Sequence, residues 1–429
     1  MESAKANGRA WMAPFFTMWT GQAFSLLGSQ LTQFALVWWI TKTTGSATLL
    51  ATATMVALLP GVLIGPFAGA LVDRWHRRTV MMVADGGIAF FSAWLGYLFY
   101  IGAAQPWHVY VIMFARAVGG AFHWPAMQAS TSLMVPKEQL SRVAGLNQTL
   151  NGAMNILAPA LGALVVSIMP LYGVMLIDVV TAALAVSILS FVHVPQPDKP
   201  QTAEDGPKSL LRDVHEAFHY IGRWPGLTWV VIAATMINFL LNPAFYLMPI
   251  LVLHHFGGDA IQLGALNSGY GIGAVIGGLI LSAWGGFRRR IFTSLMGVIG
   301  IGVGTLLMGL APQWAFWMAM VGVLLTGVMY PITNGPVLAV IQSSVAPEIQ
   351  GRVFTVMQAG VMAMSPLSML VAGPIADAVG VRAWYWVAGA ASIVAGVAGF
   401  FVPAIVYLED GHSAAQPACS PAASPDADS

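Results

Sequence analysis

The sequence predicts an all-α membrane protein with twelve transmembrane helices in two similar six-helix bundles. Apolar residues make up 57% of the 429 residues and charged residues only 8%, whereas a water-soluble domain carries about a quarter charged residues. Apolar stretches of about 20 residues, the length that crosses about 30 Å of hydrocarbon, recur along the chain. Basic loops also repeat at a constant spacing, which indicates an internal duplication.

Each predicted span is a long apolar run bounded by short polar or glycine- and proline-containing loops. The polar start, Met1–Arg9, leads directly into the first run, and no cleavage site for a secretory signal follows it. The spans are predicted at 12–40, 47–72, 79–103, 107–134, 143–168, 171–194, 226–254, 261–285, 291–311, 314–343, 353–378 and 382–407.

The basic residues define the orientation of these spans. With the N-terminus in the cytoplasm, fifteen of the 18 Lys and Arg residues fall in cytoplasmic segments, two fall outside and Arg116 lies within a span. Cytoplasmic loops of membrane proteins carry an excess of Lys and Arg. We therefore expect a multi-pass protein of the inner (plasma) membrane with both termini in the cytoplasm.

Two basic landmarks indicate that the second half repeats the first in the same orientation. Gly69, before the loop Asp73–Arg78, corresponds to Gly278, before Phe287–Arg290, with an offset of 209. Arg142 corresponds to Arg352 with an offset of 210. Parallel duplication of this kind occurs in transporters that bind their substrate between two halves near the bilayer midplane.

The predicted organisation has four parts. A proline- and charge-rich linker separates the bundles, and its Ser209–Tyr220 segment places apolar residues on one face, which favours an amphipathic helix on the inner leaflet. The tail is low in complexity and typical of disorder. The parts are an N-terminal bundle (1–194), a cytoplasmic linker (195–225), a C-terminal bundle (226–407) and a disordered cytoplasmic tail (408–429).

Three ionisable groups lie well inside the first bundle, where charge is costly and is usually paired or functional. Arg116 and Asp178 lie about 13 Å and about 10 Å from the outer ends of their spans, at 1.5 Å per residue, so a pair between them is sterically plausible. Asp85 lies nearer the inner surface, where Arg77, Arg78 or Arg142 could reach it.

Proton coupling requires a group whose protonation changes during the transport cycle. A neighbouring arginine favours the charged form of a carboxylate, and burial without a partner favours the neutral form. Asp178 is the first candidate, and His123, on the same face as Arg116, is the second. A fixed ion pair that sets helix packing is the alternative for Arg116 and Asp178, and a structural hydrogen bond is the alternative for His123.

Polar side chains recur at helical spacing on the first and seventh spans, and Tyr246 and Asn334 could complete the wall of the second half. Such a face would not tolerate lipid, so it borders either a cavity or neighbouring helices. A cavity lined by amides and hydroxyls with few charges would suit a large amphipathic or weakly charged solute. The predicted lining residues are Gln22, Ser25, Ser29, Gln33, Asn238, Asn242, Tyr246 and Asn334.

The run from Gly69 to Arg78 resembles the signature loop between the second and third helices of the major facilitator superfamily. Within that superfamily, the chain is similar to the bacterial exporters that include macrolide-efflux and enterobactin-export proteins, through Gly21-Gln22 and Phe122–Ala126 among other stretches. His76 stands where the superfamily loop usually has Gly. The fifth span retains only Gly145, Pro159 and Gly162 of an antiporter signature.

The resemblance implies that Arg116 occupies the fourth-helix arginine position linked to proton transfer, and that the signature loop latches the cytoplasmic ends of the two halves together. A carboxylate among arginines at a helix end can make charge-assisted hydrogen bonds to an opposing helix. The alternative is that the arginines serve topology alone. The predicted latch residues are Gly69, Asp73, Arg74, Arg77, Arg78, Asp85 and Arg142.

These observations predict a secondary active transporter, most simply one that couples protons to efflux of an amphipathic small molecule such as a drug, a macrolide-like compound or a siderophore. The chain contains no phosphate-binding loop of the P-loop type.

The only cysteine, Cys419, lies in the tail, so neither a disulfide framework nor a thiolate metal site is predicted. The spans also carry no pattern of catalytic groups. We expect no cofactor, metal or nucleic acid, and a monomer; an uptake permease, a lysolipid transporter and a non-transporting scaffold or receptor remain alternatives.

Overall fold

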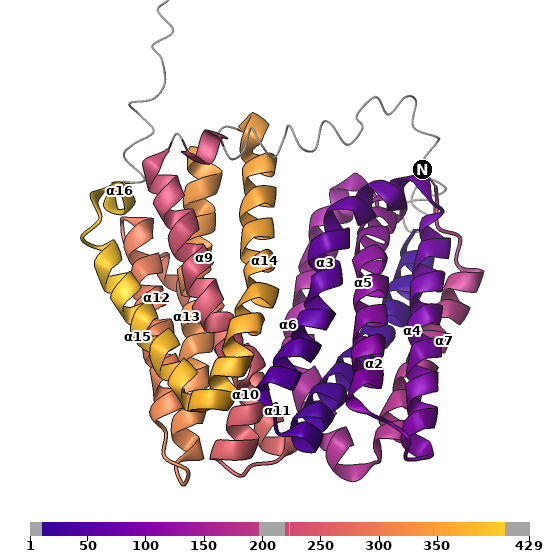
Figure 1. Cartoon of the computed structure of the whole chain (residues 1–429). Coiled ribbons are helices and arrows are strands. Elements are labelled where there is room, and N and C mark those ends of the chain that lie inside the picture. The colour runs from indigo at the N-terminus through magenta and orange to yellow at the C-terminus, as the bar shows by residue number, and fades with distance from the viewer. Residues whose placement is uncertain (1–10, 197–218, 223, 346, 408–429) are drawn as a thin grey trace, which may run out of the picture.

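The computed structural model describes residues 11–196, 219–222, 224–345 and 347–407. Within these ranges all regular secondary structure is helical, and twelve helices have 19 to 33 residues. The predicted all-α fold with two six-helix bundles is confirmed. Figure 1 shows the first half in indigo to magenta and the second half in pink to yellow, side by side.

The first half contains six long helices and one short 3₁₀ turn. These are α2 (Met12–Thr44), α3 (Ala47–Arg74), α4 (Arg77–Tyr100), α5 (Pro106–Met134), η1 (Lys137–Gln139), α6 (Leu140–Ile168) and α7 (Leu171–Phe191). The second half repeats this pattern with a short irregular segment after its first helix. Its elements are α9 (Pro225–Tyr246), α10 (Met248–Ile250), the π-helical turn η2 (Leu251–His255), α11 (Ala260–Trp284), α12 (Arg290–Leu310), α13 (Phe316–Ser344), α14 (Pro347–Val379), α15 (Val381–Gly399) and α16 (Pro403–Val406).

Eleven of the long helices are apolar enough over 18 residues to cross a membrane. The twelfth, α5, is 29 residues long and packs against α3 and α4 within the first half. It carries Arg116 and His123, and its place inside the bundle explains how a less apolar helix is accommodated. The predicted amphipathic helix of the linker falls mainly on residues 197–218, and this segment and the tail from residue 408 lie outside the described residues.

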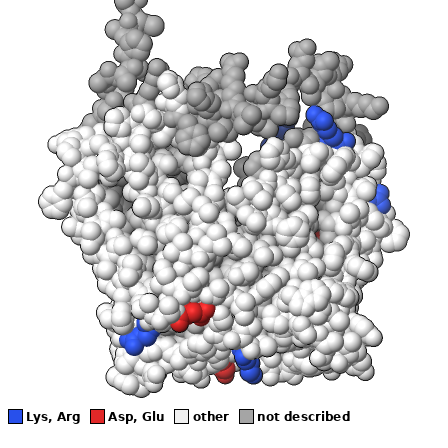
Figure 2. All heavy atoms as spheres, viewed as in Figure 1, with Lys and Arg blue, Asp and Glu red and all other residues white. Residues whose placement is uncertain are grey.

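The two ends of the bundle differ in charge. We define the arginine-rich end as the one that bears the α3–α4 and α11–α12 loops, and the arginine-poor end as the one that bears the α2–α3, α9–α11 and α14–α15 connections. Figure 2 shows charged atoms near these two ends and an almost uncharged band between them. This band is the surface that a bilayer would cover.

The internal repeat is visible in matching side-chain contacts. Arg77, the first residue of α4, donates to the carbonyl of Ala129 near the end of α5, at 2.9 Å. Arg290, the first residue of α12, donates to the carbonyl of Ala339 near the end of α13, at 3.4 Å. Corresponding arginines thus donate to corresponding carbonyls in the last two turns of the neighbouring helix.

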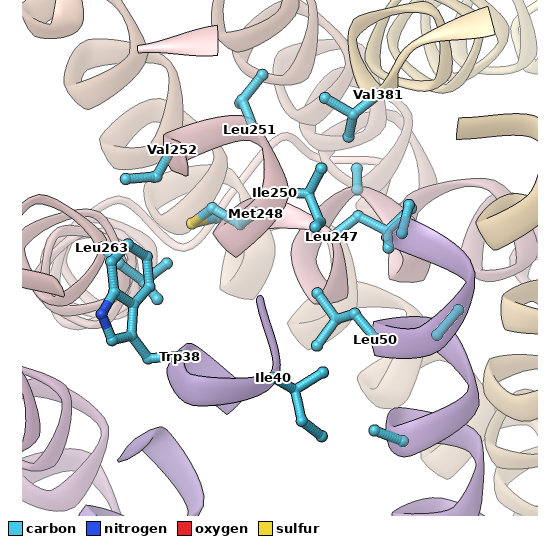
Figure 3. Close-up of a cluster of buried hydrophobic side chains, with 14 of the residues drawn as sticks. Trp38, Ile40, Leu50, Leu247, Met248, Ile250, Leu251, Val252, Leu263 and Val381 are labelled. Carbon is cyan, nitrogen blue, oxygen red and sulfur yellow. The ribbon is translucent and has the colours of Figure 1, made fainter. Parts of the chain in front are cut away.

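The two halves share one hydrophobic core at the arginine-poor end. Figure 3 shows Trp38 and Leu50 of the first half facing the segment around Met248 and Ile250 of the second. Each of these four side chains is at most 6% exposed. The short segment α10–η2 therefore closes this end as an apolar plug between the halves.

At the arginine-rich end the hydrophobic cores of the two halves are separate. One cluster of buried side chains, around Phe15 and Met81, belongs entirely to the first half, and another, around Leu227 and Val353, belongs to the second. In Figure 1 the ribbons of α3 and α14 diverge toward this end. The structure is therefore closed at the arginine-poor end and parted at the arginine-rich end.

The glycine row of α3 agrees with this state. The spacing of Gly61, Gly65 and Gly69 predicts close approach of a partner helix, but no atom of the described residues lies within 4 Å of a Cβ added at any of the three. The prediction is wrong for this conformation because α14 contacts α3 closely at the other end, where an added Cβ at Gly373 would lie 2.9 Å from the Thr48 Cα.

Candidate functional site

Arg116 of α5 and Asp178 of α7 form an ion pair inside the first half. Their side chains are 9% and 1% exposed, so both charges are removed from solvent. Their similar depth made this pair sterically plausible from the sequence, and the structure forms it. Because opposite charges compensate each other, the pair places an arginine inside the bundle without a net charge.

Three side chains donate hydrogen bonds to the Asp178 carboxylate. Its Oδ2 accepts from Arg116 and from the Ser92 hydroxyl of α4 at 2.6 Å, and its Oδ1 accepts from the Ser29 hydroxyl of α2 at 3.2 Å. Arg116 also donates to the backbone carbonyl of Ser29 at 2.9 Å. Four helices of the first half thus meet at one carboxylate, which accepts from three of them.

Close packing of α2 on α7 makes this network possible. An added Cβ at Gly28 would lie 3.4 Å from the Asp178 Cα and 3.2 Å from the Thr181 Cβ. A larger residue at Gly28 would push the helices apart and lengthen the bond from Ser29. The glycine immediately before the polar residue therefore positions the donor.

A second polar cluster surrounds Asp85 of α4, which is 4% exposed. Its carboxylate accepts from Gln22 at 3.1 Å and from Ser25 at 3.4 Å. His123 lies 3.5 Å from the same carboxylate, and its Nε2 is 2.8 Å from the Gln22 Oε1. Because an amide oxygen only accepts, the His123 Nε2 carries the hydrogen of its contact with Gln22, and this contact joins α5 to α2 beside Asp85.

This placement of Asp85 differs from its predicted partnership with Arg77, Arg78 or Arg142. The position of a residue along its helix gives its height in the membrane, but not the direction in which its side chain points. The Asp85 side chain points toward α2 and α5, and its partners come from these helices. Arg78 donates to the Ser190 carbonyl at the end of α7, and Arg142 donates to Gln139 at 3.2 Å.

The latch itself lies partly outside the described residues, because the side chain of Asp73 is not among them. Arg74, the last residue of α3, is exposed. Within the part of the chain that the structure describes, no atom lies within 4 Å of a Cβ added at Gly69. The two halves are parted at this end in the present conformation. The latch therefore stays a prediction for the conformation in which this end is closed.

The polar face of α2 proves to be mainly an interhelical contact. Gln22 and Ser25 are 6% and 5% exposed and bind Asp85, and Ser29 binds Asp178. The sequence predicts cavity lining for these residues, but two buried carboxylates need several donors each and take them from this helix. Gln33 is half-buried.

The predicted polar residues of the second half divide into two groups. Asn242 donates to the Ser365 hydroxyl of α14 at 2.7 Å, and the Tyr246 hydroxyl interacts with the same serine. Asn238 and Asn334 donate to carbonyls one turn earlier in their own helices, each at 2.9 Å. Only the first group joins two helices.

Sequence reasoning missed several residues that complete these networks. Ser92 is a single serine in an apolar span, and Ser365 has only Ser368 near it, so neither stands in a polar stripe that would mark it. Tyr270 of α11 packs against Phe245 and Tyr330 with ring centroids 5.1 and 6.0 Å apart, and Tyr330 is half-exposed. Phe245 is next to Tyr246 in sequence, and the three rings come from three helices of the second half, α9, α11 and α13.

Two cavities lie at the arginine-rich end of the first half. One of about 440 Å³ is bordered by Trp11, Phe16 and Arg142, and the other of about 550 Å³ by Trp75, Phe91 and Phe122. The second is mostly apolar and lies between α4 and α5. Among the described residues, no group of three or more His, Cys, Asp or Glu side chains could hold a metal ion.

Known proteins resemble the chain over nearly its full length. The sequence profile of the Major Facilitator Superfamily matches residues 18–261 and 231–418. Macrolide efflux protein A of Streptococcus pyogenes is 31% identical over 380 residues, covering 88% of this chain and 93% of that protein. The multidrug efflux pump Tap of Mycolicibacterium fortuitum is 25% identical over 397 residues, covering 89% and 94%.

Solved structures share the fold. A mutant of the nucleoside transporter NupG superposes with a TM-score of 0.70 at 12% identity, covering 90% of this chain and 98% of that one. At this identity the likeness concerns architecture alone. Together with the matched profile and the full-length relatives, it shows that the chain is a transporter of the major facilitator superfamily, in the group that includes macrolide efflux protein A.

Proposed function

We propose that the chain exports an amphipathic small molecule from the cytoplasm, driven by protons that move inward. The observation that carries this proposal is the buried Arg116–Asp178 pair with its two serine donors. Apolar residues of similar volume would provide a fixed packing contact without the free-energy cost of burying two charges. A transporter that must bind and release a proton needs such a group.

In the proposed orientation the arginine-rich end faces the cytoplasm, as the positive-inside rule predicts. The present conformation then has its outer end closed and its cytoplasmic end parted. A substrate would enter from the cytoplasm or the inner leaflet, between the halves. Alternating access requires the reverse conformation, with the outer end parted.

The surroundings of Asp178 support the proposal of proton coupling. In the present state Arg116, Ser92 and Ser29 all donate to its carboxylate. A movement of α5 relative to α7 that separated Arg116 from Asp178 would leave the carboxylate among apolar groups, where the neutral form is favoured. The carboxylate would take a proton in that state and return it when the pair reforms.

The Asp85 cluster provides a second proton position, nearer the cytoplasmic end of α2. His123 is about one-fifth exposed, whereas Asp178 is fully buried. Ser25 and Ser29, one helical turn apart on α2, contact the two carboxylates in turn. We propose that the proton passes between Asp178 and the cytoplasm through this part of the bundle.

The substrate wall is proposed on the second half, where few buried charges occur. Asn242 and Tyr246 offer polar groups, and Tyr270 and Tyr330 offer aromatic faces. Aromatic and amide groups suit a large amphipathic solute, which gains from burial of its apolar surface and needs few hydrogen bonds. The names of two relatives, a macrolide efflux protein and a multidrug efflux pump, support export of such compounds.

The test of this function is accumulation of a panel of macrolides and amphipathic dyes in bacteria that produce the chain. We expect lower steady-state accumulation of at least one compound than in cells with an empty vector, and loss of this difference after a protonophore is added. The Arg116→Ala variant, produced in equal amount in the membrane, is the control for non-specific effects. Accumulation that rises on production of the chain would indicate uptake instead.

A further inference from the structure

Asp377, near the end of α14, caps the first turn of α3 in the opposite half. Its Oδ1 accepts from the Ala47 N–H at 2.7 Å, and its Oδ2 accepts from the Thr48 N–H at 2.9 Å and from the Ser46 hydroxyl at 2.8 Å. Three donors of one half therefore converge on one carboxylate of the other. The residues that meet are 329 to 331 positions apart in the chain.

The cap is shared between the halves. The first N–H groups of a helix have no intrahelical acceptor. In α3 the N–H of Leu49 bonds the Ser46 hydroxyl at 3.3 Å, as an ordinary N-cap does, while Ala47 and Thr48 depend on Asp377. A carboxylate at this position also interacts favourably with the helix dipole.

Small residues allow α14 to reach this position. An added Cβ at Gly373, one turn before Asp377, would lie 2.8 Å from the Ala51 Cβ and 2.9 Å from the Thr48 Cα. Ala47 and Ala376 are 1% and 5% exposed. The backbones of α3 and α14 therefore touch at the arginine-poor end, and the carboxylate is held at the N-terminus of α3.

We propose that Asp377 is a gating residue that holds the arginine-poor end closed. Parting of the halves at this end must break all three of its bonds at once and leave two N–H groups of α3 to water. Because bonds to a charged acceptor are stronger than neutral ones, removal of the carboxylate shifts the equilibrium toward the conformation that is open at this end. The inference depends on the exchange between two conformations, and not on the direction of transport or on protons.

Asp259 provides a matched control. It is also an acidic N-cap at the arginine-poor end, but it accepts from the Gln262 N–H at 3.0 Å within its own half. Asp259→Ala removes a helix cap without removing a contact between the halves. A general effect of a lost cap would appear in both variants, whereas a gating effect would appear only at Asp377.

The experiment is a double electron–electron resonance measurement on the purified full-length chain with Cys419→Ser. Spin labels are placed at Tyr100→Cys and Trp314→Cys, which are exposed at the arginine-poor end of opposite halves. We expect Asp377→Ala to raise the population ratio of the longer to the shorter distance about tenfold, the equivalent of one charge-assisted bond. Asp259→Ala should leave the distribution unchanged.

A second variant guards against misfolding. Asp377→Asn keeps the shape of the side chain and one acceptor oxygen, so a smaller shift in the same direction is expected. An unchanged distance distribution in both Asp377 variants would overturn the proposal, as would an equal shift in Asp259→Ala. These outcomes are independent of the accumulation panel, because no substrate or proton gradient is present.

Discussion

Arg116→Ala is expected to reduce transport about a hundredfold or more while the protein still inserts into the membrane. Without the guanidinium, the Asp178 carboxylate would be buried with hydroxyl donors alone. The proposed coupling depends on the exchange of Arg116 for other surroundings during the cycle, and this variant removes that exchange. Removing one partner of a buried pair also costs about 3–5 kcal/mol of stability.

The double variant Arg116→Ala/Asp178→Ala separates stability from coupling. It removes both charges, so we expect thermal stability to recover much of the loss while transport stays at the level of the single variant. Arg382→Ala is the control, since this arginine bonds the Gly309 carbonyl at 2.9 Å and lies outside the pair. Transport at the wild-type rate in Arg116→Ala would remove the pair from the mechanism.

Gly373→Val is expected to open the arginine-poor end and reduce transport at least about tenfold. The added side chain would meet the backbone of α3 at Thr48 and the methyl group of Ala51, at 2.9 and 2.8 Å from its Cβ. Overpacking of this kind costs about 1–3 kcal/mol, and each 1.4 kcal/mol shifts a two-state equilibrium about tenfold. The clash exists only in the conformation that is closed at this end.

Reaction of a cysteine at Val252 with a membrane-impermeant maleimide measures this opening. Val252 is 0% exposed in the apolar plug, so it should react only when the plug parts. Gly360→Val on the same helix is the matched control, because no atom lies within 4 Å of a Cβ added there. Equal reaction rates in the Gly373 and Gly360 variants would contradict the assigned contact.

Features that repeat along the chain were predictable from the sequence. The number and positions of the long helices follow from the lengths of the apolar runs, and the two halves follow from the offsets at Gly69 and Arg142. The Arg116–Asp178 pair was sterically plausible from the sequence because both charges lie inside the bundle at a similar depth. Each of these inferences used only the height of a residue along the membrane normal, which follows from its position within a span.

Features that depend on the side of a helix, or on the conformation, were not predictable in this way. Asp85 was placed near arginines by its height, but it faces Gln22 and His123. The glycine row of α3 is free of close contact because the halves are parted there. Asp377 is near the end of a span, where a carboxylate needs no partner, and its partner at Ala47 is in the opposite half.

The most direct test of proton-driven export uses the purified chain in proteoliposomes with an imposed pH gradient. Movement of a compound identified in the accumulation panel is followed together with the internal pH. The account predicts that substrate accumulates on the side from which protons leave, and that Arg116→Ala abolishes both fluxes. Substrate movement at the same rate without a pH gradient, with no accompanying change in internal pH, would contradict it.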